Sequence, residues 1–97
     1  MEIGSTVNIT WTTAIGATYY ELYRSEASGS NGSIIDVLQT NSFIDNTVIK
    51  DTLYYYRVKS CNEIGCSNYS KADRGYIGRV NEPINPSIIM QIRALNL

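Results

Sequence analysis

Residues 53–62 read Leu53-Tyr54-Tyr55-Tyr56-Arg57-Val58-Lys59-Ser60-Cys61-Asn62, and their side chains alternate in character. An extended strand points successive side chains to opposite faces, so this stretch places Tyr54, Tyr56, Val58 and Ser60 on one face. Tyrosine and valine favour the pleated, half-buried surface of a sheet. Residues 53–62 are therefore predicted to form a strand with one buried face.

The same period of two recurs earlier in the chain. Val7, Ile9 and Trp11 share one face of residues 6–12, and Tyr20 and Leu22 share one face of residues 19–23. Inward-facing residues of neighbouring strands meet in one core. The predicted core consists of Ile9, Trp11, Tyr20, Leu22, Tyr54, Tyr56 and Val58.

Shorter strands are predicted between and after these segments. They cover residues 33–40, 41–45 and 66–72, the last as the hairpin partner of 53–62. Stretches rich in Gly, Ser and Asn separate them. No window shows a helical period long enough for a stable helix. The chain is predicted to be all-β, as a sandwich or a small barrel.

The composition excludes several classes of protein. The 97 residues are 43% hydrophobic and 18% charged, as in a folded domain, and the net charge is −1. A charge this close to balance argues against a nucleic-acid partner. No apolar run is long enough to insert in a membrane, and no stretch has the features of a signal peptide. The chain has no histidine, which removes the commonest general base and transition-metal ligand. We expect no enzyme activity.

Cys61 and Cys66 flank a four-residue turn, so they are expected to face each other across a hairpin. Opposed positions of an antiparallel pair lie within disulfide range, and a disulfide would indicate a secreted or cell-surface location. The alternative is a pair of reduced thiols in a cytosolic domain. A metal site is disfavoured, because two thiolates leave a tetrahedral zinc ion half-liganded.

Other polar and aromatic residues give no catalytic pattern. The nine carboxylates are scattered through turns and outward strand positions, and no serine or threonine has a histidine to activate it. No cofactor, catalytic residue or metal ligand is predicted. Tyr19, Tyr23 and Tyr55 are predicted to face outward. They either form a surface that binds protein or carbohydrate, or pack across strands to shield the sheet.

Four segments together resemble the fibronectin type III domain. They are Val7–Trp11, Ala17–Arg24, Thr52–Val58 and Asn62–Ser67, and they match its strands B, C and F and its F–G turn in order and spacing. The phrases around Cys61–Ser67 and Asp73–Tyr76 are similar to tandem repeats of bacterial secreted and cell-surface proteins. The resemblance implies an immunoglobulin-like, two-sheet antiparallel sandwich over residues 1–78. It also implies that Trp11 is the core tryptophan of strand B and Tyr54 the tyrosine-corner residue.

The order of strands departs from that family at both ends of the chain. The chain opens almost directly at strand B, and residues 79–97 follow strand G as a linker and a segment similar to strand A. This segment places Ile88, Met90, Ile92 and Ala94 on one face.

The reach of the tail bears on where that segment docks. In the family, strand A begins at the pole opposite to the end of strand G, and the ten steps from Tyr76 to Pro86 span at most about 33–36 Å. We therefore expect the segment to complete a neighbouring molecule, as a closed dimer or an open filament. Self-completion and an undocked tail remain as alternatives.

These observations predict a non-catalytic extracellular module that acts as a spacer, adhesion or assembly unit. Its expected partners are neighbouring copies or adjacent repeats of the same protein. The alternative is an accessory module that binds carbohydrate or protein through the outward tyrosines. Fold alone does not decide between them.

Overall fold

The computed structural model describes residues 6–27, 29–49, 52–76 and 87–96, with the backbone alone in 73–76 and 87–91. Its seven strands are β1 (Thr6–Trp11), β2 (Tyr19–Ser25), β3 (Ser33–Leu38), β4 (Ser42–Asp45), β5 (Leu53–Cys61), β6 (Asp73–Tyr76) and β7 (Ser87–Ile92). None of these described ranges forms a helix, so the all-β prediction is confirmed. Over the same ranges there is no helix with the length and hydropathy that a membrane crossing needs.

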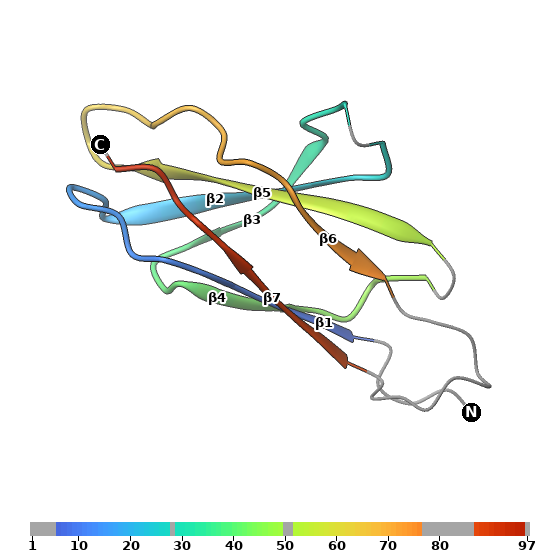
Figure 1. The fold of residues 1–97 in the computed structure, drawn as a ribbon. Helices are drawn as coiled ribbons and strands as arrows, with labels where there is room; N and C mark the ends of the chain where they lie inside the picture. The colour runs from blue at the N-terminus through green and yellow to red at the C-terminus, as the bar shows by residue number, and fades with distance from the viewer. Residues whose placement is uncertain (1–5, 28, 50–51, 77–86, 97) are drawn as a thin grey trace.

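The strands form two sheets that face each other (Figure 1). One has three strands in the order β4-β1-β7, and the other has four in the order β3-β2-β5-β6. Every pairing between these strands is antiparallel except one, since β7 runs parallel to β1. Within residues 6–76 every pairing is antiparallel, as expected for the sandwich of residues 1–78, and the parallel strand β7 lies beyond that range.

The core lies between the sheets, because alternate residues of β1, β2 and β5 point inward. Burial alternates strictly along β1 and along most of β5, as their sequences predict. All seven residues of the predicted core belong to one buried cluster. Val7, Val48 and Ile92 join them, the last from β7.

A buried carboxylate joins the two sheets at one end of the sandwich. Asp45, at the end of β4, is only 2% exposed and forms an ion pair of 2.8 Å with Arg24 of β2. The Tyr56 hydroxyl donates to its Oδ2 at 2.8 Å, while the amide and hydroxyl of Thr47 donate to its Oδ1. We call this end the Asp45 pole, and the opposite end, where β5 reaches Cys61, the disulfide pole.

These contacts determine the protonation of the cluster. Burial by itself raises the pKa of Asp45, but the hydrogen bonds from Thr47, Tyr56 and Arg24 outweigh it, and the pKa is lowered. Burial and the hydrogen bond to Asp45 raise the pKa of Tyr56. Asp45 is therefore ionised and Tyr56 is neutral at physiological pH.

Residues 66–72 were predicted as a strand, and this prediction is wrong. Only Cys66 pairs with β5, as an isolated bridge to Cys61, and regular pairing resumes where Asp73 lies opposite Tyr56. Between these two pairings β5 has residues 57–60, whereas its partner segment has residues 67–72. The two extra residues prevent a regular ladder.

Serine side chains take the place of the missing ladder bonds. The hydroxyl of Ser67 accepts the amide of Ser60, and that of Ser70 accepts the amide of Val58, each at 3.0 Å. Backbone amides of the same two serines donate to the carbonyls of Ser60 and Val58. β5 therefore keeps its hydrogen bonds beside an irregular neighbour.

Candidate functional site

The edge of β1 that faces β7 holds a segment from the far end of the sequence. β7 pairs with β1 along its whole length, from Thr6 opposite Ser87 to Trp11 opposite Ile92. Ile92 is 2% exposed and lies in the core, and Ala94 packs against the core from just beyond the strand. We call residues 6–12 on this side the docking edge.

Hydrogen bonds extend this contact beyond the strand to the disulfide pole. The amide of Thr12 donates to the carbonyl of Ile92, and the amide of Ala94 donates to Oγ1 of Thr12, both at 3.0 Å. The amide of Ile15 donates to Oδ1 of Asn96 at 2.8 Å. Thr12 and Asn96 were not predicted as site residues, because nothing in the local pattern distinguishes them from ordinary surface residues.

The four residues predicted to dock share one side of the tail, and the structure describes two of their side chains. Ile92 and Ala94 both contact the core. Ile88 and Met90 lie opposite Val7 and Ile9 in the register, and their side chains fall outside the described residues.

The reach argument for docking on a neighbour is wrong. The family pattern led us to expect that the segment begins at the pole opposite to the end of the preceding strand. In the structure the strand is parallel, and Ser87 lies opposite Thr6 at the Asp45 pole, where β6 also ends (Figure 1). No return along the sandwich is needed, so the segment completes its own chain. The predicted boundary at residue 78 therefore does not separate β7 from the sandwich. Docking on a neighbouring copy stays a prediction.

Cys61 and Cys66 form a disulfide, as predicted, with 4.0 Å between their Cα atoms. Asn62 and Gly65 exchange backbone hydrogen bonds on one side of the pair, and the amide of Ser67 donates to Ser60 on the other. The cysteines thus occupy a non-hydrogen-bonded position, where opposed strands come closest. This geometry suits a cross-strand disulfide.

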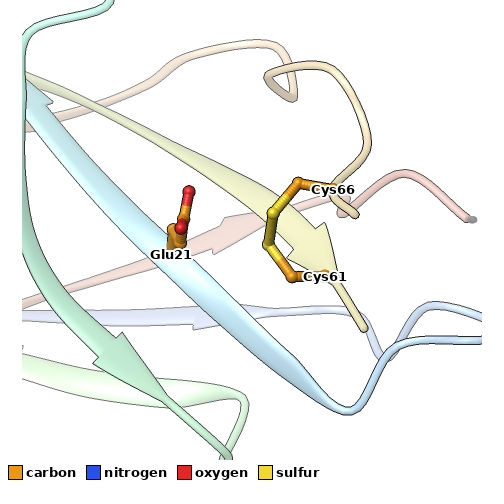
Figure 2. A group of neighbouring side chains, drawn as sticks. All are labelled: Glu21, Cys61 and Cys66. Carbon is orange, nitrogen blue, oxygen red and sulfur yellow. A yellow bond between two sulfur atoms is a disulfide. The ribbon is translucent and has the colours of Figure 1, made fainter. Parts of the chain in front are cut away.

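Glu21 lies beside the disulfide on the outer face of the four-stranded sheet (Figure 2). A carboxylate oxygen of Glu21 and the two sulfur atoms lie within 4.8 Å of one another. A cysteine sulfur binds a metal ion well only as a thiolate, and here the two sulfur atoms are bonded to each other. In its disulfide form this group is therefore not a metal centre.

The three outward tyrosines do not converge on one patch. Tyr19 lies opposite Cys61 and Tyr55 lies opposite Ser25, so along β2 they are about 20 Å apart. All three, including Tyr23 between them, are half-buried.

Tyr23 is engaged by its neighbours. Its ring packs edge-on against that of Tyr69, with 4.9 Å between the ring centroids, and its hydroxyl donates a hydrogen bond to Glu21 at 2.7 Å. The ammonium group of Lys59 lies 4.4 Å from the centroid of the Tyr69 ring. Burial and the hydrogen bond to Glu21 raise the pKa of Tyr23. This arrangement is the cross-strand packing that sequence analysis gave as an alternative to a binding surface.

The turn at residues 62–65 borders shallow depressions. One of about 370 Å³ is lined by Gly16, Thr18, Asn62, Glu63 and Ile64. Glu63 is the only ionisable side chain in that lining, and a single exposed carboxylate has no second group with which to share acid–base work. The docking edge, by contrast, is defined by continuous backbone pairing and a buried apolar side chain.

Comparisons with protein-family models, with curated proteins and with solved structures found no match to this chain.

Proposed function

We propose that the protein is a non-catalytic extracellular module of the fibronectin type III kind, acting as a spacer, adhesion or assembly unit. The docking edge is the observation that carries this proposal. It receives an extended segment from elsewhere in the sequence through backbone pairing and a buried apolar side chain. This is β-augmentation, by which a sheet edge recruits a strand, and it works equally between molecules.

Details of the sandwich support the family. The hydroxyl of Tyr54 accepts the amide of Ile49 at 3.1 Å, five residues upstream and just before β5. A tyrosine corner makes this contact at the start of strand F. Trp11 lies in the core on β1, which is consistent with the resemblance of this segment to strand B.

A peptide-capture experiment tests the assembly role. An Ile92→Asp substitution in the full chain puts a charge in the core position and should release β7 from the docking edge. We expect a synthetic peptide of residues 86–96 to bind this variant and raise its melting temperature. The same peptide carrying Ile92→Asp is the matched control and should do neither.

The test also works if the variant does not fold by itself. If the variant is unfolded, recovery of its β-sheet circular dichroism on adding the wild-type peptide reports the same binding. Absence of both binding and recovery would contradict assembly through the docking edge.

The disulfide supports the extracellular location, since such bonds persist in oxidising compartments. Protein alkylated as it leaves the cell that makes it, without reductant, should keep the mass of the unmodified chain. Addition of two alkyl groups would contradict this location. The same sample alkylated after reduction is the positive control.

A further inference from the structure

We infer that two copies of the chain exchange β7 reciprocally and form a closed, two-fold dimer. This inference rests on the proposed assembly role and names its partner, which is the segment 87–96 of a second copy. The direction of β7 and the pole at which it enters the sandwich both favour this exchange.

β6 ends and β7 begins at the same pole. Tyr76 of β6 lies opposite Leu53, the first residue of β5, and Ser87 of β7 lies opposite Thr6, the first residue of β1. The beginnings of β1 and β5 meet at Asp45, which pairs with Val7 and accepts the Tyr56 hydroxyl. The donor segment therefore leaves its domain at the Asp45 pole.

The docking edge also accepts the segment from the Asp45 pole, because β7 is parallel to β1. A segment that docks on a second copy in this orientation enters that copy at the same pole from which it left its own. The two molecules then face each other through identical surfaces. Such an isologous arrangement closes with two-fold symmetry, and each copy fills the other's docking edge.

The opposite orientation would give a different assembly. An antiparallel segment would leave one copy at the Asp45 pole and enter the next at the disulfide pole, so the contact would be heterologous. Heterologous contacts that do not close build open filaments. The parallel register thus selects the dimer over the filament, a choice that sequence analysis left open.

Exchange keeps every described contact of the segment. Ile92 fills the same core position, and the hydrogen bonds that join Thr12 to Ala94 and Ile15 to Asn96 form between chains instead of within one. Because the contacts are identical, the balance between the closed monomer and the exchanged dimer depends mainly on protein concentration.

Cysteine pairs at matched register positions test the exchange. Asn8 lies opposite Ile89. Full-length chains carrying Asn8→Cys and chains carrying Ile89→Cys are mixed and unfolded without reductant, at a pH that keeps the new thiols protonated. They are then refolded together at the highest soluble concentration and mildly oxidised. We expect a covalent species with twice the mass of the chain, whose bond joins positions 8 and 89 of different chains.

Two controls make the result decisive. A mixture of Asn8→Cys and Glu63→Cys chains, with position 63 at the disulfide pole, should give no such species. A single chain carrying both Asn8→Cys and Ile89→Cys should close within itself at low concentration, which tests docking without exchange. If this double variant does not close, docking itself and the proposed assembly role are contradicted.

The remaining outcomes concern exchange alone. If the double variant closes but the mixture stays monomeric, the exchange is refuted while docking stands. When the double variant is refolded and oxidised at high concentration, the largest covalent species should be a dimer. A ladder of larger species would overturn the closed dimer in favour of a filament.

Discussion

At the scale of single residues, Trp11 shows how a core side chain stabilises this small domain. It is 1% exposed, packs edge-on against Tyr20 with 5.8 Å between ring centroids, and stands opposite Ile92 in the register. Its indole nitrogen is buried with no hydrogen-bond partner among the described residues. The side chain therefore contributes through packing.

Replacing Trp11 with Ala should lower the free energy of unfolding by about 3–5 kcal/mol, because it leaves a large cavity between the sheets. Trp11→Phe should cost less, since it keeps an aromatic ring and removes the unpaired donor. Urea unfolding of both variants measures the difference. Equal stability of Trp11→Ala and the wild type would contradict the core position.

Asp45 couples the stability of the fold to pH. Its pKa is lowered in the folded state, so the ionised carboxylate stabilises that state above its unfolded pKa of about 3.9. This contribution is lost as the pH falls through the lowered folded pKa. Stability should therefore decline below about pH 4.

Asp45→Asn is the matched variant, and it should cost about 2–3 kcal/mol near neutral pH because Arg24 loses its charged partner. It should also flatten the decline in acid. Unfolding free energies measured between neutral pH and acid test both expectations. A variant that keeps the full acid-dependent decline would assign that decline to other carboxylates.

At the scale of elements, the irregular segment 67–72 depends on two hydroxyl groups. Ser70 is buried beside Val58, whose amide it accepts, whereas Ser67 is half-buried and water can reach its site. The two positions make the same kind of bond in different surroundings. Their comparison therefore isolates the effect of burial.

Ser70→Ala should cost about 1–3 kcal/mol, because the amide of Val58 is left buried without an acceptor. Ser67→Ala should cost about 0.5–1 kcal/mol, since water can replace its hydroxyl. Thermal melts rank the two variants, and amide exchange at Val58 should accelerate only in the first. The reverse order would show that burial does not govern these bonds.

At the scale of the whole molecule, stability depends on a strand that comes last in the sequence. Ile92 lies in the core with residues of β1, β2 and β5, while the next residue, Arg93, is exposed. Substitutions at these two adjacent positions therefore distinguish the loss of docking from a mere change in the tail.

Ile92→Ala should lower the free energy of unfolding by about 2–5 kcal/mol, as for any large aliphatic side chain in a core. Arg93→Ala should change it by less than about 0.5 kcal/mol. Chemical denaturation of both variants under the same conditions measures this contrast. If the two variants match, β7 does not complete the sandwich in solution.

Local pattern was enough to predict much of the fold. The strands with one buried face, β1, β2 and β5, were predicted to within about two residues at each end, and the core residues follow from their alternation. The disulfide was predictable as well, because its two cysteines flank a short turn. Each of these features depends on residues close together in the sequence.

Contacts between distant residues were not predictable. Asp45, Arg24 and Tyr56 come from three strands, and Glu21 reaches the disulfide through the pairing of β2 with β5. Residues 66–72 lack apolar alternation, so nothing local showed that serine hydroxyls replace the ladder there.

The alternation of apolar residues was enough to predict a strand in the segment that contains β7, whereas the way this strand docks depends on the tertiary structure. Alternation places every second side chain on one face whichever way a strand runs, so it cannot distinguish parallel from antiparallel pairing. In the structure β7 begins at the Asp45 pole, where β6 ends, and therefore runs parallel to β1. The parallel orientation of β7, and with it the closed dimer that we infer, follows from that tertiary arrangement.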